Sequence, residues 1–256
     1  MSTQRFITHL GEIADMFYQC NDQWRGFAFT KAINEVAKLD EIEFTVTGNL
    51  ATKIKGVGKA IQDVLEQFNV TESSEKYRKL KLRVAELEEK NKRFDAELCK
   101  AKVTELLLPL TNAGIDWDFA GSMRRGSDTV KDVDVVVCLH DETHDRNIVN
   151  AAIEAAGLEA DVRNGQEKVG VSVPIGNGNN VTLDLNFCHP ENRGAMYLYF
   201  TGPKAYNITQ RGHVKKLGLR LNQHGLWKGK KLVAGKTEQE IFDALELQYV
   251  KPSERT

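Results

Sequence analysis

The segment of the sequence that is most informative about the fold is GSMRRGSDTVKDVDVVV, from Gly121 to Val137. Asp132 and Asp134 stand at the head of its valine-rich part, and such a run predicts a β-strand. Because side chains alternate along a strand, both carboxylates point to the same face of the sheet. Two neighbouring carboxylates repel each other unless cations lie between them. A hard divalent ion such as Mg²⁺ suits this arrangement, because it takes oxygen ligands and keeps waters for phosphate groups.

A third carboxylate, Asp184, lies in the alternating sequence Val181–Phe187, which is also expected to form a strand. If this strand lies beside the first one, Asp184 joins the pair and completes a site for two metal ions. Such ions activate an attacking hydroxyl and stabilise a leaving pyrophosphate. The turn Gly121–Ser122 offers a backbone and a hydroxyl that can bind phosphate. Arg124 and Arg125, which follow it, can neutralise a triphosphate.

Two motifs together carry a family resemblance. The pattern of Gly-Ser, nine residues and then Asp-x-Asp, with two arginines in between, resembles the nucleotidyltransferase superfamily of DNA polymerase beta. The segment Tyr199-Phe200-Thr201-Gly202 resembles the Y-F-T-G motif of the family X DNA polymerases in that superfamily. The sequence continues in register with this family to Asn222, and the ending from Glu240 is also similar. The resemblance covers residues 100–256 well and residues 25–69 more loosely.

The resemblance implies a role for each acidic residue and for the nucleotide-binding residues. Asp132 and Asp134 would bind both metal ions, Mg²⁺ or in its place Mn²⁺, and Asp184 would bind the ion at the primer terminus. The residues expected to bind the incoming nucleotide are Ser122, Arg125, Tyr199, Phe200, Gly202 and Asn207. The first two would contact its phosphates, the two aromatic residues would lie against its sugar, and the asparagine would reach the minor-groove edge of its base.

The residues expected to bind DNA are Gly56, Gly58, Lys59, Arg211 and Lys215. The first three belong to Lys55–Lys59, a Gly-Val-Gly turn between predicted helices that is the signature of a helix-hairpin-helix. Its glycines let the backbone approach a phosphate, and the amides of the next helix can donate to that phosphate. By the resemblance, Arg211 would report the shape of the new base pair from the template side. Residues 202–236 contain nine basic and no acidic residues, which slightly favours a polyanion partner over a solvated face.

The pattern of elements predicts an α+β protein in four parts. Residues 1–70 are expected to form a helical helix-hairpin-helix domain, and residues 71–104 a single charged linker helix. The linker carries a short apolar heptad seam, which favours packing onto the rest of the chain over a coiled-coil dimer. Residues 105–195 are expected to form a nucleotidyltransferase palm with a mixed β-sheet, and residues 196–256 a carboxy-terminal α/β subdomain that selects the nucleotide.

The sequence departs from the family pattern at three places. Val64 stands where the family has the lysine that forms a Schiff base, and valine cannot do this, so a deoxyribose-phosphate lyase activity is in question. A second helix-hairpin-helix subdomain is missing, and only residues 71–104 fill its place. Thr182 and Asn186 stand where the family often has arginines beside the third aspartate, so an ion pair from those arginines to the metal site is lost.

The function expected from the resemblance is template-directed addition of deoxynucleotides to a primer 3′ end, in gap-filling DNA repair. DNA and deoxynucleoside triphosphates are the expected partners, and a monomer is expected. A template-independent nucleotidyltransferase acting on DNA ends and a non-catalytic DNA-end scaffold are the alternatives. The net charge of −1 favours none of them. No apolar run approaches the ~20 residues that span a bilayer, and the first residues lack the basic-then-apolar order of a signal peptide. The four scattered cysteines without a C-x-x-C pair suggest reduced thiols, so an intracellular, soluble protein without membrane association is expected.

Overall fold

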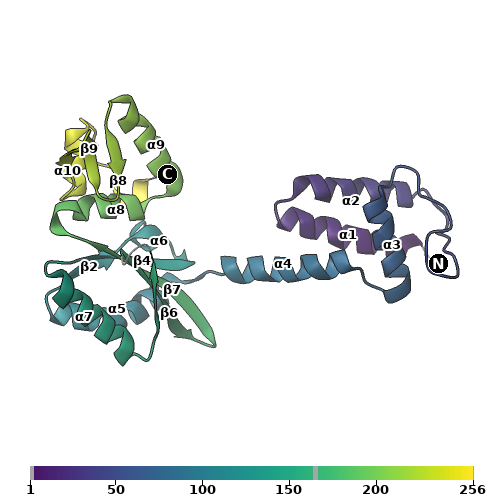
Figure 1. Cartoon of the computed structure of the whole chain (residues 1–256), viewed down its shortest axis with the longest axis horizontal. Coiled ribbons are helices and arrows are strands. Elements are labelled where there is room, and N and C mark those ends of the chain that lie inside the picture. Colours follow the sequence, from purple (N-terminus) through teal and green to yellow (C-terminus); the bar gives the residue numbers. More distant parts are fainter. Residues whose placement is uncertain (1–2, 164–166, 256) are drawn as a thin grey trace. The chain divides into compact units, whose positions relative to one another are not determined.

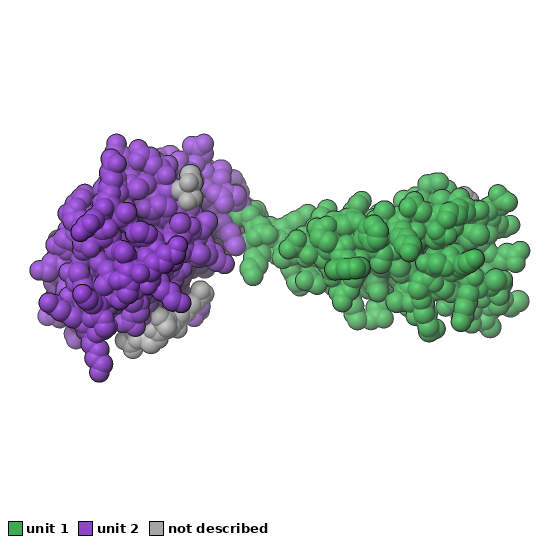
Figure 2. Space-filling model, turned by 90° about the horizontal axis from the view of Figure 1, so that it is seen from above, with its two compact units in different colours: residues 1–92 green, residues 93–256 purple. Residues whose placement is uncertain are grey.

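The computed structural model describes residues 3–163 and 167–255, and it divides into two compact units, residues 1–92 and 93–256 (Figure 1, Figure 2). Residues 1–2, 164–166 and 256, which fall in the expected first domain, palm and carboxy-terminal subdomain, lie outside the described residues. Each unit has a hydrophobic core of its own. Within the described ranges, no helix is both long and apolar enough to cross a membrane.

Unit 1 is helical. Its α-helices, over the described residues, are α1 (Thr3–Gln19), α2 (Gln23–Val36), α3 (Lys59–Thr71) and α4 (Glu75–Asn91). Apolar residues recur on one face of α1 and bury Phe6, Leu10 and Ile13 completely. The Phe6 ring stacks on Phe44 and meets the edge of Phe68, each with 5.4 Å between ring centroids. The core of unit 1 therefore ties α1 to α3 and to the segment between α2 and α3.

That segment ends in the glycine pair expected for a helix-hairpin-helix. Gly56 has φ +81°, in the left-handed region that favours glycine. Gly58 is the extended residue that precedes α3, and no side chain caps the helix there. Ile61, Val64 and Leu65 then bury one face of α3 against the core. The backbone amides at the start of α3 are thus presented on a short turn, as the sequence predicts.

The expected single helix over residues 71–104 is wrong. The helix α3 ends at Thr71, α4 covers only part of the interval, and α5 (Ala96–Asn112) begins in unit 2. The apolar seam is divided accordingly. Tyr77, Leu80 and Val84 pack in the core of unit 1, whereas Phe94 packs against that of unit 2.

Tertiary pairing explains the break. Lys92 leaves the helical conformation with ψ 137°, and Arg93 then donates hydrogen bonds to the side chain and carbonyl of Thr129. The strand β1 (Phe94–Asp95) pairs with β3 (Thr129–Val130). Asp95 caps α5 by accepting a hydrogen bond from a backbone N–H. The partner is 36 residues further along the chain, so local periodicity could not reveal it.

The first part of unit 2 has α+β structure. Its other elements are β2 (Asp116–Phe119), α6 (Gly121–Arg124), β4 (Asp132–Cys138), α7 (Glu142–Ala155), β5 (Ala160–Arg163), β6 (Lys168–Gly176) and β7 (Asn179–Cys188). Over the described residues, five strands form a sheet in the order β2-β4-β7-β6-β5. The strands β4 and β7 pair in parallel, and their other neighbours pair in antiparallel fashion. This is the mixed sheet expected from the sequence.

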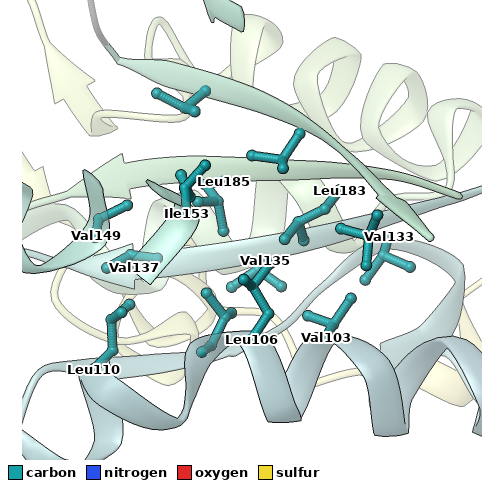
Figure 3. Packing of buried hydrophobic residues seen from close by; sticks show 14 of the residues in the cluster. Val103, Leu106, Leu110, Val133, Val135, Val137, Val149, Ile153, Leu183 and Leu185 are labelled. Atoms are coloured by element: carbon teal, nitrogen blue, oxygen red, sulfur yellow. The ribbon is translucent and has the colours of Figure 1, made fainter. Parts of the chain in front are cut away.

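The core of this part lies on one face of the sheet. Figure 3 shows Leu106 and Leu110 of α5 facing the odd-numbered valines of β4, with Leu183 and Leu185 of β7 alongside. The valines are completely buried, as alternation along a half-buried strand requires. The even-numbered residues of β4, which include both aspartates, consequently project from the opposite face.

A tight turn joins β6 to β7. Asn177 and Gly178 connect the strands, with φ +52° and φ +71°. Two successive residues with positive φ are typical of a two-residue hairpin turn, and the pair asparagine–glycine favours it. The connection that precedes Asp184 is therefore as short as a hairpin allows.

The rest of unit 2 is a smaller α/β part. Its elements are η1 (Pro190–Asn192), α8 (Arg193–Thr201), α9 (Lys204–Lys216), β8 (Arg220–Asn222), β9 (Gly225–Lys228), β10 (Lys231–Ala234), α10 (Glu238–Ala244) and η2 (Pro252–Glu254). The helix α8 touches the backbone at the start of α10, since a Cβ on Gly194 would collide with Thr237. Met196 and Tyr197 of α8 pack against Val136 on β4. The helix α8 thus covers the face of the sheet that carries the aspartates.

We predict that acid destabilises unit 1 through His9. This residue is buried, lies 4.1 Å from the Phe68 ring between ring centroids, and its Nε2 is 3.1 Å from the Ser74 hydroxyl. Burial lowers the pKa of His9 below its ordinary value of 6.5, against the opposing charge of Glu12. The unfolded chain therefore takes up a proton first, and stability falls as the pH drops below about 6.5.

Hydrogen exchange of the α1 amides, corrected for intrinsic rates, should show less protection at about pH 5.5 than at about pH 7.5. A His9→Phe variant serves as the control, because its ring can still stack but cannot take up a proton. An equal loss of protection in this variant would contradict the role of His9.

Candidate active site

The acidic residues lie on two adjacent strands. In the parallel pair of β4 and β7, Asp134 is opposite Asp184, and Asp132 is opposite Thr182. Both residues of the Asp-x-Asp motif are partly buried and alternate with the buried Val133. The sheet therefore brings the third aspartate beside the first two, although about fifty residues separate them in the sequence.

The negative charges of the three carboxylates repel one another. Burial, together with the charges of Asp132 and Asp184, raises the pKa of Asp134 to about 7, although Lys168 and Arg125 act in the opposite direction. A raised carboxyl pKa means that the surroundings disfavour its negative charge. The site consequently has too little positive charge of its own for all three carboxylates.

Asp184 has one engaged and one unengaged oxygen. Its Oδ2 lies 2.7 Å from the Nζ atom of Lys168 on β6. Its Oδ1 is buried and has no hydrogen-bond partner within the described part of the chain. Among the described residues, no three His, Cys, Asp or Glu side chains are gathered as a metal site. The donor set nevertheless fits a divalent cation, because the oxygens are hard ligands, one of them is orphaned, and the carboxylates repel one another.

Lys168 was not anticipated from the sequence. With Thr182 and Asn186 uncharged, the sequence predicts only that an ion pair from arginines at these two positions is lost, and a lysine on the adjacent strand provides a different one. In the register of β6 with β7, Lys168 is opposite Asn186 and Gly170 is opposite Asp184. The ion pair therefore crosses the strands diagonally, and no motif of a single strand could have revealed it.

The glycine turn fits tightly around the aspartates. Gly121 has φ +57°, and a Cβ at this position would collide with the Oδ2 atom of Asp134. The one-turn helix α6 follows, and it holds Ser122 and Arg125 at the same cleft as Asp134. One guanidinium N–H of Arg125 donates to the carbonyl of Thr201. Glycine is thus required here by both backbone conformation and lack of space.

A cleft of about 530 Å³ joins these residues to α8 and α9. The residues predicted for the site that line it are Ser122, Arg125, Asp132, Asp134, Tyr199, Phe200, Gly202, Asn207 and Arg211. Asp184 and Lys215 are not among its lining residues. The cleft therefore gathers all six residues that the sequence assigned to the nucleotide, while Asp184 is opposite Asp134 on the next strand.

Three further cations line the cleft, and the sequence had not assigned them to a site. They are Arg93, Lys131 and Lys204. Lys131 directly precedes Asp132, so its position in the motif was a usable signal. Arg93 offered no such signal, because only the pairing of β1 with β3 brings it to the cleft.

Hydrogen bonds hold the end of α8 against α9. The Nδ2 atom of Asn207 donates to the carbonyl of Tyr199 at 2.6 Å. The guanidinium carbon of Arg211 lies 5.8 Å from the Tyr199 ring centroid, and Nε of the same side chain donates to the Asn207 carbonyl at 3.0 Å. The rings of Tyr199 and Phe200 meet edge to face. Lys215 is exposed one turn further along the same face of α9.

Arg124 is not aimed at the cleft. Its guanidinium donates to both oxygens of Glu238, at 3.0 and 2.7 Å, and to the hydroxyl of Thr201 at 2.7 Å. The fully buried side chain of Arg255 donates to the same carboxylate at 2.9 Å. Burial alone would raise the pKa of Glu238, but the hydrogen bond from Arg124 and the charge of Arg255 lower it. The expected contact of Arg124 with a triphosphate is therefore wrong, since this side chain links α6 to α10.

The DNA-binding residues predicted in unit 1 lie at the exposed start of α3. Gly56 and Gly58 form the turn described above, and the Lys59 side chain is 90% exposed. Its ammonium group lies 3.4 Å from the carboxylate of Asp63. An exposed pair of this kind contributes little to stability, so Lys59 remains able to meet a phosphate.

A groove of about 480 Å³ lies elsewhere on unit 1. It is lined by α3 and α4 and by Arg25, and its basic residues from α4 are Lys76, Lys79 and Arg83. Val64, at the place of the family's Schiff-base lysine, also lines this groove but is buried. The valine thus faces the same groove as Lys76 and Lys79 of α4. The sequence alone did not show that these lysines lie near it.

We predict that Glu238→Ala destabilises unit 2 strongly. The change leaves Arg124 and Arg255 without their shared carboxylate, and breaking a buried pair costs about 3–5 kcal/mol. Urea unfolding would measure this loss. Glu105→Ala is the control, because its 3.1 Å pair with Lys102 is exposed and should contribute at most about 1 kcal/mol. Equal losses in the two variants would show that the buried network is no more important than a surface pair.

Comparison with protein families identifies both ends of the chain. Residues 1–74 match a helix-hairpin-helix domain. Residues 196–256 match the thumb of DNA polymerase beta. The first match contains the glycine turn of unit 1, and the second contains most of α8, all of α9 and the three-stranded sheet of unit 2.

Known proteins resemble about half of the chain. Repair DNA polymerase X of African swine fever virus is 31% identical over 138 residues, which are 53% of this chain and 78% of the viral protein. DNA polymerase lambda of Rattus norvegicus is 28% identical over 167 residues, 56% of this chain and 29% of that protein. The PolX DNA polymerase/3′-5′ exonuclease of Bacillus subtilis is 28% identical over 112 residues, 44% of this chain and 19% of that protein. Together with the two domain matches and the aspartates gathered on β4 and β7, these similarities establish that the chain belongs to the family X DNA polymerases.

Proposed function

We propose that the chain is a template-directed DNA polymerase that adds deoxynucleotides to a primer 3′ end during gap-filling repair. The observation that carries this proposal is the register of β4 with β7, which puts Asp184 opposite Asp134, and Asp134 lines a cleft together with Ser122 and Arg125. A cleft lined by both carboxylates and cations suits a triphosphate whose charge is shared between metal ions and side chains. The relatives named above, a repair DNA polymerase and DNA polymerase lambda, support the same reaction class.

Asp132, Asp134 and Asp184 would hold two Mg²⁺ ions, for which Mn²⁺ could substitute. When bound, the ions would lower the pKa of the primer hydroxyl and neutralise the charge on the pyrophosphate that leaves. The orphaned Oδ1 atom of Asp184 and the mutual repulsion of the carboxylates support this assignment. The protein's own part is to fix the three carboxylates on two hydrogen-bonded strands, so that they cannot move apart.

The cleft residues would bind and orient the nucleotide. The Ser122 hydroxyl and the N–H groups of Arg125 that are not used by Thr201 would donate to the phosphates. Tyr199 and Phe200 would lie against the sugar, and the turn at Gly202, with φ +60°, would leave little room for a 2′-hydroxyl. Asn207 would reach the minor-groove edge of the base, which requires its amide to release or share the Tyr199 carbonyl.

Basic residues in both units would bind the DNA. Gly56, Gly58 and Lys59 present a backbone turn and an exposed ammonium group, which suits a phosphate on the strand downstream of a gap. In unit 2, Arg211 and Lys215 extend the nucleotide-binding face of α9 toward the template. Because Val64 cannot form a Schiff base, the deoxyribose-phosphate lyase reaction is not part of the proposal.

Primer extension with and without a template strand separates this proposal from its alternatives. The two-residue turn between β6 and β7 disfavours a template-independent enzyme, because no long loop there can take the place of a template. A non-catalytic scaffold is disfavoured because an unused cluster of acids only costs stability. Extension that requires a template, and that Asp184→Ala abolishes, is the expected result. Extension without a template would favour the first alternative, and none under any condition would favour the second.

We predict that Asp134→Ala lowers single-turnover nucleotide incorporation by several orders of magnitude and leaves DNA affinity nearly unchanged. The residue lies beside both other aspartates but carries no DNA-binding charge. Rapid-quench kinetics and a DNA-binding titration on the same preparation measure the two effects. Retention of more than about a tenth of the wild-type rate would refute the two-metal assignment.

We predict that Arg211→Ala slows correct insertion more than mismatched insertion. Asn207 and Arg211 share one face of α9, from which they could meet the minor-groove acceptors that all correct base pairs have in common. Pre-steady-state insertion of matched and mismatched nucleotides measures the change. If both insertions slow equally and the salt dependence of DNA binding weakens, Arg211 is instead a phosphate contact.

A further inference from the structure

Asp184 meets a cation that its own strand does not supply. In this chain Thr182 and Asn186, its same-face neighbours on β7, are uncharged. The ammonium group of Lys168, from β6, lies 2.7 Å from the Oδ2 atom of Asp184. The Lys168 side chain is 27% exposed and that of Asp184 only 11%, so the pair is shielded on the side of the aspartate. A charge pair with this degree of burial is much less screened than one on the surface.

Among the described residues, the carboxylate of Asp184 is the hydrogen-bond and ion-pair partner of the Lys168 ammonium group. The neighbour of Lys168 across the strands is Asn186, whose Nδ2 donates to the carbonyls of Val135 and Asp184, whereas Lys168 passes the Oδ1 acceptor of Asn186, which has no partner within the described ranges. Gly170, opposite Asp184, has no side chain that could block this path. The ammonium group therefore neutralises one of three crowded carboxylates in the protein without metal.

We propose that Lys168 is a positioning residue that holds Asp184 in the metal-free enzyme and competes with the cation that Asp184 would bind. The inference rests on the proposed function, in which Asp184 is a metal ligand. A divalent ion on the free Oδ1 would share one carboxylate with the ammonium group on Oδ2, and two cations at such close range repel each other, so the ammonium group withdraws as the divalent ion binds. The partly exposed lysine side chain has room to do so. Lys168 consequently weakens metal binding at Asp184 and keeps the three carboxylates together until the metal replaces it.

The test is a titration of the full chain with Mn²⁺, without DNA or nucleotide. The electron paramagnetic resonance signal of free Mn²⁺ measures how much of the ion is bound. Removing the ammonium group in Lys168→Met should tighten Mn²⁺ binding about tenfold, the effect of a ~1.4 kcal/mol change. Lys168→Arg, which keeps the charge, should bind Mn²⁺ as the wild type does. The matched control is Lys102→Met, which removes a lysine from an exposed ion pair with Glu105 and should change nothing.

A second measurement, the melting temperature, shows whether a change in Mn²⁺ binding arises only because the variant folds poorly. Without metal, Lys168→Met should melt at a lower temperature than the wild type, because three carboxylates then lack their shared cation. Saturating Mn²⁺ should raise its melting temperature more than that of the wild type, since tighter binding to the folded state stabilises it more. The neutral polar variant Lys168→Gln, whose side chain is shorter than that of lysine, should behave in the same way.

The outcomes separate this inference from the proposed function. Tighter Mn²⁺ binding in Lys168→Met that disappears in the double variant Lys168→Met, Asp184→Asn supports the competition. If Asp184→Asn weakens Mn²⁺ binding but Lys168→Met matches the wild type, the role of Lys168 is wrong and the metal assignment stands. If Asp184→Asn changes Mn²⁺ binding in neither background, the metal assignment fails, and the inference fails with it.

Discussion

The parallel pairing of β4 with β7 is the constraint on which the site depends. Each strand is apolar on the face that meets α5 and α7, and the burial of Val133, Val135 and Leu183 there fixes the register. A slip by one residue would turn the aspartates of β4 into the core, where unpaired charge is very costly. The hydrophobic face therefore determines where the charged face can be. It also forces Asp134 and Asp184 together, although their charges oppose it.

Cations from neighbouring elements of unit 2 partly offset the negative charge of these aspartates. Lys168 meets Asp184 from the next strand, and Arg125 acts on Asp134 from α6. The second arginine of the motif, Arg124, has a different task, because Glu238 binds it and links the aspartate-bearing part to the carboxy-terminal part. Adjacent arginines thus have separate functions, and the direction of each side chain decides which one it has.

The helices of unit 1 are held together by their apolar faces. Its glycine turn presents backbone amides at the start of α3. Its charged helix α4 ends where Arg93 and Phe94 find partners in unit 2. Helical periodicity continues across this point in the sequence, but a helix persists only where no stronger pairing competes for its backbone. The strand pair β1–β3 and the cap at Asp95 supply that competition.

Local patterns in the sequence were sufficient to predict the strand of Asp132 and Asp134, the turn before Asp184 and the glycine hairpin. Two motifs were also sufficient to suggest the family to which the chain belongs. Spacing and turn chemistry act over a few residues and so indicate the strand, the turn and the hairpin, whereas the family follows from the resemblance of two motifs to known ones. Only the tertiary structure decided which cations serve the aspartates and where the charged helix ends. Arg93, Lys168 and Glu238 act on residues that lie 16 or more positions away, and hydrogen bonds and ion pairs over such separations depend on how strands and helices meet. A single sequence records the charges of these residues, whereas the packing of the chain determines which of them become neighbours.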